Sequence, residues 1–238
     1  MGHDVSSIPL NKFPTNLRKV CFICVNTYNS YRQNLGTFPI TDSVAFAKCM
    51  KSFEFDVYIL QSPHVKNFLP YMDKFLETVQ EQLVFFYAGQ PLVDPNESDN
   101  IQEMHFLFDD GSVNETQLAD HIINHKNPSS YLYMITERCH KGSVFDIGPG
   151  ISCGKQLPPK CISFSCIPDP TSSAQTNTFA TERGVFVFQF TKILRDVTDC
   201  TPEQLEIFLK KFFTQYGHIF AVGLSSPELK TEPMFYIE

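Results

Sequence analysis

Cys139 follows a short apolar run and stands in a polar turn, an arrangement that presents a thiol to solvent. The run Tyr131–Thr136 is β-rich in composition, and the polar segment ERCHKGS comes directly after it. Arg138, His140 and Lys141 flank the thiol, and nearby positive charge favours the thiolate, the reactive form of cysteine. The sequence therefore makes Cys139 a candidate nucleophile. A surface cysteine at a strand end is the plain alternative.

The other cysteines carry weaker signals. Cys21 and Cys24 have CxxC spacing, but they lie in an apolar, strand-like run, where residues i and i+3 point to opposite faces. A redox pair usually sits at a helix N-terminus. Cys153, Cys161 and Cys166 lack a zinc-like spacing with any histidine pair. We therefore expect core or incidental cysteines at these positions.

The first half of the chain predicts the elements that position these residues. The run KVCFICVN is continuously apolar, like a strand buried on both faces of a parallel sheet. Apolar residues from Phe68 to Val79 recur at helical spacing. The expected elements are strand 19–26, a helix capped by Thr41 or Asp42 and ending near residue 52, strand 55–60, helix 66–80 and strand 82–88. This β-α-β-α-β order is typical of a parallel sheet with helical crossovers.

The second half continues the pattern. The expected elements are strand 105–108, a helix opened by a capping box at Ser112–Glu115 and ending near His125, strand 131–136, strand 160–167, a buried helix 184–197, a helix opened by a capping box at Thr201–Gln204 and ending near Tyr216, and strand 218–224. We expect residues 1–17 to be a flexible lead-in and residues 18–238 to form one domain. Within it, residues 141–160 are rich in Gly and Pro and predict a long loop.

Composition limits the partners and the location. The formal net charge is −7, and no cluster of Lys and Arg suggests nucleic-acid binding. No apolar run approaches the roughly 20 residues that a membrane span needs, and the polar N-terminus lacks a signal-peptide core. Eight cysteines in such a chain indicate reduced thiols. We expect a cytoplasmic protein that binds neither nucleic acid nor membrane.

Two segments resemble the catalytic motifs of metacaspases, relatives of caspases in protists, fungi and plants. Glu137–Ser143 resembles that family's D-x-C-H-S-G-S nucleophile turn, and Phe85–Pro91 is similar to its F-Y-x-S-G-H-G strand end. The separation, 139 − 90 = 49 residues, matches the spacing of about 50 between histidine and cysteine in caspase-like enzymes. Further similar segments, in the family's order, are Leu35–Asp42, Ile162–Cys166 with Thr171-Ser172, and Gly223–Ser226.

The resemblance covers residues 19–226 and implies a fold. It implies a caspase-like α/β domain, in which a mostly parallel sheet of about six strands carries helices on both faces. The motifs are weak singly. Their order agrees with the β-α-β-α-β pattern derived from the residues, and the two together favour this fold.

Two residues depart from the catalytic pattern. Gln90 stands where the resemblance places the histidine that acts as general base and acid. Glutamine cannot take a proton from a thiol near neutral pH, and losing such a group costs roughly 10²–10⁴ in rate. Pro91 stands where the family has a glycine whose N–H completes the oxyanion hole, and proline has no N–H. Losing one such donor costs on the order of 10²–10³.

The resemblance also implies a substrate pocket and a metal. Metacaspases prefer Arg or Lys at the cleaved position, and the acidic residues that hold it correspond to Asp42 and Glu137. Some metacaspases bind calcium, for which Asp146 matches one position and Asn114-Glu115 match an acidic pair only loosely. Calcium usually takes six to eight oxygens, so the site looks incomplete, and we expect no required cofactor.

These observations lead to two hypotheses. The first is a metacaspase-like pseudoprotease that binds a protein or peptide partner, with an active metacaspase paralogue as one candidate. The alternative is an active cysteine endopeptidase that cleaves after Arg or Lys, with Cys139 as nucleophile and an unidentified base. Among the other histidines, His140 adjoins the cysteine, His105 lies on a predicted strand, and the sequence does not place His64, His121 or His125 near the sulfur.

Overall fold

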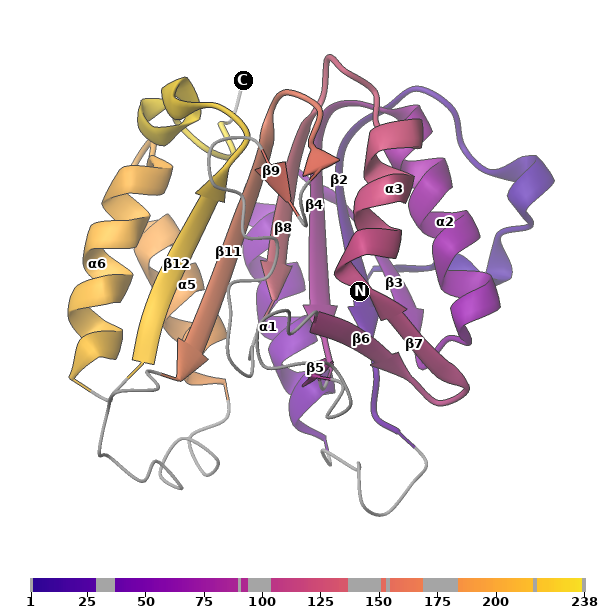
Figure 1. Cartoon of the computed structure of the whole chain (residues 1–238), viewed down its shortest axis with the longest axis horizontal. Coiled ribbons are helices and arrows are strands. Elements are labelled where there is room, and N and C mark those ends of the chain that lie inside the picture. Colours follow the sequence, from indigo (N-terminus) through magenta and orange to yellow (C-terminus); the bar gives the residue numbers. More distant parts are fainter. Residues whose placement is uncertain are drawn as a thin grey trace.

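A seven-stranded β-sheet forms the centre of the molecule (Figure 1). The computed structural model describes residues 2–28, 37–89, 91–93, 104–136, 151–152, 155–168, 184–215 and 218–236. The strand order is β1 (His3–Asp4), β3 (Asp56–Gln61), β2 (Leu17–Val25), β4 (Val79–Ala88), β8 (Tyr131–Thr136), β11 (Cys161–Pro168) and β12 (His218–Leu224). Every neighbouring pair is parallel except β11 with β12. The predicted, mostly parallel sheet is confirmed, with seven strands instead of six.

The extra strand comes from the N-terminal segment, for which the prediction of a flexible lead-in is wrong. β1 pairs with β3, and two short 3₁₀ helices follow it, η1 (Val5–Ser7) and η2 (Leu10–Lys12). Val5 is fully buried, and Phe13 packs edge-on against Phe75 with ring centroids 4.9 Å apart. Two apolar side chains in a polar segment thus tie it to the sheet.

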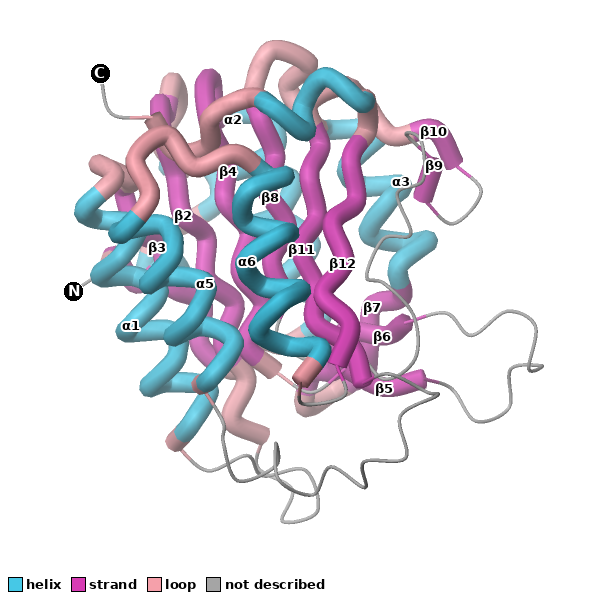
Figure 2. Tube along the Cα trace, turned by 90° about the vertical axis from the view of Figure 1, so that its left-hand side faces the viewer, coloured by secondary structure: helices cyan, strands magenta, loops and turns pink. Residues whose placement is uncertain are grey.

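Helices cover both faces of the sheet, as Figures 1 and 2 show. One face carries α2 (Val65–Thr78) and α3 (Glu115–His125). The other carries α1 (Phe38–Ser52), α5 (Val185–Asp196) and α6 (Pro202–Thr214). Each central strand contributes alternate side chains to the two faces, so the domain has one hydrophobic core on each side of the sheet. This arrangement explains why the central strands are continuously apolar in sequence.

Two of the three predicted helix caps are wrong. α1 begins at Phe38 after Thr37, so Asp42 lies inside the helix and does not cap it. α3 is capped by Asn114, because Ser112 lies in a strand that runs up to Asn114. The capping box of α6 at Thr201 is confirmed.

Smaller elements lie outside the main sheet. β5 (Pro91–Val93), β6 (Met104–Phe108) and β7 (Gly111–Asn114) form an antiparallel sheet of their own. β9 (Ile151–Ser152) pairs with β10 (Lys155–Gln156), so the segment predicted as a plain loop contains a short hairpin. A third 3₁₀ helix, η3 (Pro227–Thr231), follows β12.

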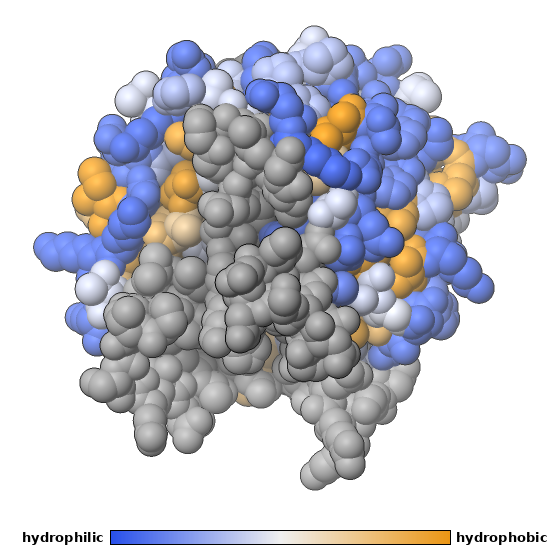
Figure 3. Space-filling model, viewed as in Figure 1, coloured by the Kyte–Doolittle hydropathy of each residue, from blue (hydrophilic) through white to orange (hydrophobic). Residues whose placement is uncertain are grey.

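On the face seen in Figure 3, hydrophilic residues predominate over the described surface, with apolar residues scattered between them. Within the part of the chain that the structure describes, no helix has the length and apolar character that crossing a membrane requires.

Phe75 is central to the core beneath α2. It is fully buried, and its ring lies 4.6 Å from that of Phe22 and 5.2 Å from that of Tyr58, centroid to centroid. We expect Phe75→Ala to lower the free energy of unfolding by about 3–5 kcal/mol, because truncation leaves a cavity among rigid strands. Urea denaturation followed by circular dichroism measures the change. The matched control is Phe188→Ala: Phe188 is 57% exposed, and its loss should cost less than about 0.5 kcal/mol.

Candidate active-site edge of the sheet

The two strands that precede the candidate catalytic residues are neighbours in the sheet. β4 and β8 pair in parallel, and the last pair of their register is Tyr87 with Thr136. The carboxyl ends of neighbouring parallel strands meet at the same edge of a sheet, where α/β proteins bind ligands. Figure 1 shows β4, β8 and β11 pointing to the same edge. Counting along the sequence, Gln90 and Cys139 each come three residues after this pair.

Four of the candidate site residues lie outside the described residues: Gln90, Glu137, Cys139 and Asp146. The described part of the edge consists of the last residues of β4, the backbone of β5, the first turns of α1 and the residue before α5. These segments determine what the fold itself requires at this edge.

Gly89 is required by the packing at the end of β4. A Cβ atom at this position would lie 2.6 Å from Cζ and from the hydroxyl of Tyr87, and 2.7 Å from the hydroxyl of Tyr28. These separations are far below van der Waals contact, so a larger residue forces the tyrosines to move. The glycine that precedes Gln90 is therefore fixed by its neighbours.

The two tyrosines form a buried hydrogen-bonded group that joins three segments. The hydroxyl of Tyr87 donates to the carbonyl of Leu107 at 2.7 Å and lies 3.1 Å from the hydroxyl of Tyr28. Burial and the neighbouring Tyr28 hold the pKa of Tyr87 well above its usual value. The backbone N–H of Asn26 also donates to the carbonyl of Ala88 at 2.9 Å, which joins the ends of β2 and β4. The hydroxyl of Tyr87 is thus neutral and, with that of Tyr28, has a structural role at this edge.

Pro91 begins β5, and its backbone pairs with Phe106 of β6. β5 is an edge strand of the small sheet, and the first position of an edge strand is one that proline tolerates. The backbone nitrogen of Pro91 carries no hydrogen and therefore cannot donate a hydrogen bond to any neighbouring group. The local fold therefore accommodates a residue that removes a backbone donor from the edge.

Asp42 lies at the start of α1 and is largely buried, with 8% of its surface exposed. It touches the start of α5: a Cβ atom placed on Gly184 would lie 2.7 Å from its Oδ1. Gly184 has a φ of 87°, a conformation that favours glycine, and precedes the first residue of α5. The structure thus holds one of the two predicted pocket carboxylates against a glycine at the sheet edge.

Asn114 and Glu115, the pair that loosely matches the acidic calcium-binding positions, lie at the start of α3. The side-chain oxygen of Asn114 accepts the N–H of Gln117 at 2.8 Å as the cap of α3. Glu115 is 7% exposed. The amide oxygen of Asn114 is thus engaged by the helix start, and the side chain of Glu115 has little contact with solvent.

The described histidines are spread over the molecule. His64 pairs with Asp110, their nearest atoms 3.1 Å apart. His121 and His125 lie on α3 beside carboxylates of α2. His105 lies on β6, where its backbone pairs with Leu92, and its Nδ1 is 3.1 Å from the hydroxyl of Ser112. His105 is therefore the described histidine whose strand pairs with the segment following Gln90.

The cysteines of the described residues are buried, as predicted for those the sequence analysis assigned to the core. Cys21 and Cys24 belong to the cores on opposite faces of the sheet, which excludes a redox pair. Burial raises the pKa of both thiols, and it raises that of Cys161 to about 12 and that of Cys49 to about 11. These thiols stay protonated and unreactive at neutral pH. Cys153 lies outside the described residues.

Two groups escaped the sequence analysis. The tyrosine pair left no local signal, because Tyr28 and Tyr87 are far apart in the chain. The cluster of Asp73, His121 and His125 was only partly predictable. The two histidines are four residues apart on one predicted helix, but nothing in the sequence placed that helix beside Asp73.

Comparison with known proteins identifies the family. Residues 17–212 match the caspase domain of the peptidase C14 family. The chain belongs to this family. Its caspase domain thus covers all the described strands from β2 to β11 and ends inside α6. No curated protein matches the sequence.

Solved structures support the caspase fold. Protein GSU0716 from Geobacter sulfurreducens is similar with a TM-score of 0.65 at 11% identity, covering 92% of this chain and 99% of that chain. Caspase-1 from Spodoptera frugiperda is similar with a TM-score of 0.62 at 12% identity, covering 90% of this chain and 88% of that chain. At such low identity, these likenesses concern the fold alone.

Replacement of Gly89 tests the packing of this edge. We expect Gly89→Ala to lower the free energy of unfolding by about 1–3 kcal/mol, because its methyl group overlaps two tyrosine hydroxyls. Urea denaturation measures the loss. In a Tyr28→Phe background the same substitution should cost less, since one of the overlapping hydroxyls is gone. Equal losses in the two backgrounds would contradict this account.

The buried thiol of Cys161 predicts a dependence of stability on pH. Its folded pKa of about 12 exceeds the ordinary value of 9.0 because burial disfavours the thiolate. Between these values the folded state retains a proton that the unfolded state loses, so stability falls as pH rises, by at most about 1.4 kcal/mol per pH unit. Urea denaturation from pH 8.5 to 10.5 under reducing conditions should show a steeper fall for the parent chain than for Cys161→Ala. Parallel profiles would contradict it.

Proposed function

We propose that this caspase-domain chain is a metacaspase-like pseudoprotease, which keeps the scaffold and the position of the thiol and acts by binding a polypeptide. The observation that carries the proposal is Gln90-Pro91, which stands where the family pattern has histidine and glycine. Glutamine supplies no general base, and proline supplies no N–H for an oxyanion. Both losses fall on the chemical step of peptide cleavage.

The geometry of the strands supports this assignment of positions. β4 and β8 stay in register up to Tyr87 and Thr136. Positions 90 and 139 follow that pair by the same number of residues, and both strands end at the sheet edge where α/β proteins bind ligands. The equal count supports treating Gln90 as the replacement of the base that serves Cys139.

The magnitudes favour a binding role. Loss of a general base costs roughly 10²–10⁴ in rate, and loss of one oxyanion donor costs on the order of 10²–10³. Such losses need not multiply when the groups act as a unit. Loss of the general base alone would reduce an ordinary turnover number to a rate that is barely detectable.

The proposed ligand is a protein or peptide that presents a basic side chain. Asp42 and Glu137 keep negative charge at both positions where the family pattern holds Arg or Lys of the substrate. A carboxylate pairs well with a guanidinium, which can make two parallel hydrogen bonds. A basic segment of an active metacaspase paralogue is one partner of this chemistry. The proposal requires no metal or cofactor.

Reversion of the two departures tests the proposal. The unaltered chain should not cleave peptides with Arg or Lys at the cleaved position, with or without calcium. Gln90→His combined with Pro91→Gly should restore both missing groups and raise cleavage by at least about 10²-fold. Release of a fluorophore from a basic peptide measures the rate. The matched controls are Gln90→Asn with Pro91 retained, and Cys139→Ala in the revertant, both of which should be inactive.

Binding needs a separate measurement. The unaltered chain should bind the same basic peptides, and fluorescence anisotropy measures this binding. Asp42→Asn should weaken it. Cleavage by the unaltered chain that disappears in Cys139→Ala would contradict the proposal. So would a revertant that binds the peptide, keeps its fold and remains inactive, because Gln90 and Pro91 would then not be the decisive losses.

One observation favours a second candidate function, an active cysteine endopeptidase with Cys139 as nucleophile and His105 as its base. The backbone of His105 pairs with Leu92, two residues after Gln90. Against it, Phe106 packs on Tyr87 with ring centroids 5.0 Å apart, and neighbouring residues of a strand point to opposite faces. His105 therefore points away from that core. If the unaltered chain cleaves basic peptides, His105→Ala should abolish the activity as completely as Cys139→Ala.

A further inference from the structure

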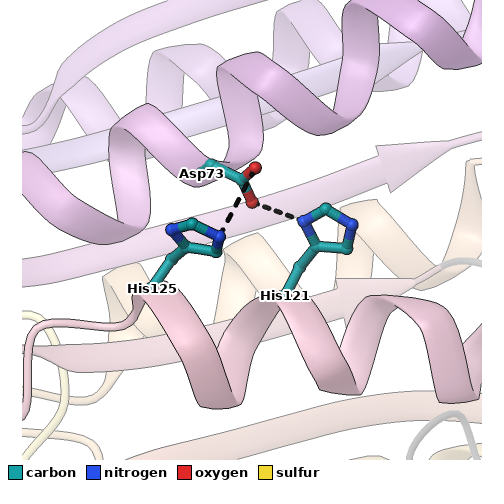
Figure 4. A group of neighbouring side chains, drawn as sticks. All are labelled: Asp73, His121 and His125. Atoms are coloured by element: carbon teal, nitrogen blue, oxygen red, sulfur yellow. Dashed lines mark hydrogen bonds and ion pairs between the residues drawn. The ribbon is translucent and has the colours of Figure 1, made fainter.

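Asp73, His121 and His125 form a compact group on the outside of the α2–α3 pair (Figure 4). The two histidines are four residues apart on α3 and project toward the carboxylate of Asp73 on α2. One ligand atom from each residue lies within 4.8 Å of the others. The side chains are 28%, 34% and 21% exposed for His121, His125 and Asp73, so an ion reaches them from solvent. The group is separate from the candidate active-site edge.

The hydrogen bonds of His125 determine what its other nitrogen can do. Nδ1 lies 2.8 Å from Oε1 of Glu77, which as a carboxylate can only accept. Nδ1 therefore carries the hydrogen, and Nε2 of the neutral ring carries a lone pair. That lone pair is 3.8 Å from Oδ2 of Asp73, also an acceptor. A metal cation between these two acceptors would interact favourably with both.

The spacing suits a metal ion. Zinc binds imidazole nitrogen at about 2.0–2.1 Å and carboxylate oxygen at about 2.0–2.2 Å, so tetrahedral ligand atoms lie about 3.4 Å apart. To reach this separation, the 3.8 Å between Nε2 of His125 and Oδ2 of Asp73 has to close by a few tenths of an ångström, and the 2.6 Å between Nδ1 of His121 and Oδ1 of Asp73 has to widen. His121 is already in contact, with its Nδ1 2.6 Å from Oδ1 of Asp73. On binding, the ion takes the place of the proton in that hydrogen bond, and the neutral ring of His121 then carries its hydrogen on Nε2.

Glu77 is placed to act behind the ligands. A metal-bound histidine usually donates its second N–H to a carboxylate, which fixes the ring and raises its basicity. Glu77 occupies that position toward His125, and its other oxygen is engaged by Lys74 at 2.9 Å. Glu77 therefore accepts the hydrogen of His125 Nδ1 and orients the ring.

The two helices are held firmly where the group lies. The backbone N–H of Asn127 donates to the carbonyl of Leu76 at 2.9 Å, and its side chain donates to the carbonyl of Val79 at 3.1 Å. Beneath the group, Leu76 and Ile122 are buried in the same core. Two histidines spaced i and i+4 on a rigid helix, opposite a fixed carboxylate, form a preorganised ligand set.

We propose that Asp73, His121 and His125 bind a divalent transition-metal ion of the zinc class, with Glu77 orienting His125, and that the ion links α2 to α3. Two imidazoles and one carboxylate suit zinc and its neighbours in the first transition row, whereas calcium and magnesium take oxygen ligands. Solvent fills the remaining coordination position. Binding to the folded state alone stabilises it.

Metal titration of the full chain tests the site. Under reducing conditions, zinc competition with a chromophoric chelator should show one ion bound per chain, and zinc should raise the Tm. Calcium and magnesium should do neither at the same concentration. We expect His121→Ala and His125→Ala each to weaken zinc binding at least about 10-fold and to abolish the Tm shift. The matched control is His64→Ala, which removes a histidine that precedes α2 and pairs with Asp110 between β6 and β7, and it should bind zinc like the parent.

Two further measurements keep the test decisive. Glu77→Ala should weaken zinc binding about 10–100-fold, and Glu77→Gln, whose amide oxygen still accepts from His125, should recover most of the loss. Cobalt bound in place of zinc should give d–d absorption of a nitrogen and oxygen site without the charge-transfer bands of thiolate ligands. If an alanine variant fails to fold by circular dichroism, Asp73→Asn replaces it. Unchanged zinc affinity in the His121→Ala, His125→Ala double variant, absence of zinc binding by the parent chain, or thiolate bands in the cobalt spectrum would each overturn the proposal.

Discussion

The in-register pairing of β4 with β8 is the constraint on which the rest of the structure depends. β4 sends Leu83, Phe85 and Tyr87 into one core and Val84, Phe86 and Ala88 into the other. A slip by one residue would exchange these two sets, which pack against different helices. Burial on both faces therefore pins the register more strongly than the backbone hydrogen bonds alone. It also fixes where each strand ends relative to its neighbour.

Packing restricts the residues before Gly89 more strictly than the residues after it. Up to this residue each position of β4 is dictated by packing, because even a methyl group on Gly89 meets the hydroxyls of Tyr28 and Tyr87. At Pro91, the first residue of an edge strand, the fold accepts a proline. The fold therefore tolerates a proline at the position where the resemblance to metacaspases expects glycine.

The sequence predicts this fold well wherever a local pattern reports on burial. Continuous apolar runs correctly gave the central strands, and the capping box at Thr201 gave the start of α6. Errors arose where the deciding contacts are distant. Thr41, Asp42 and Ser112 are all plausible caps by residue type, but α1 starts earlier and Ser112 pairs in a strand. The N-terminal segment is polar apart from residues such as Val5 and Phe13, whose burial depends on a sheet formed much later in the chain.

The same limit applies to the sites. The candidate nucleophile and the positions where its partners are expected can be predicted because their motifs are local, whereas Asp73 and His121 meet only because two crossover helices lie side by side. Those helices lead directly into β4 and β8, and the metal ligands lie near the helix ends from which these strands begin. The carboxyl ends of both strands, at the opposite edge of the sheet, lead to the candidate active site. A cation between α2 and α3 therefore braces both strands at their starts. Its direct effect is on the stability of the β4–β8 pair, and it supplies no group to the chemistry at the other edge.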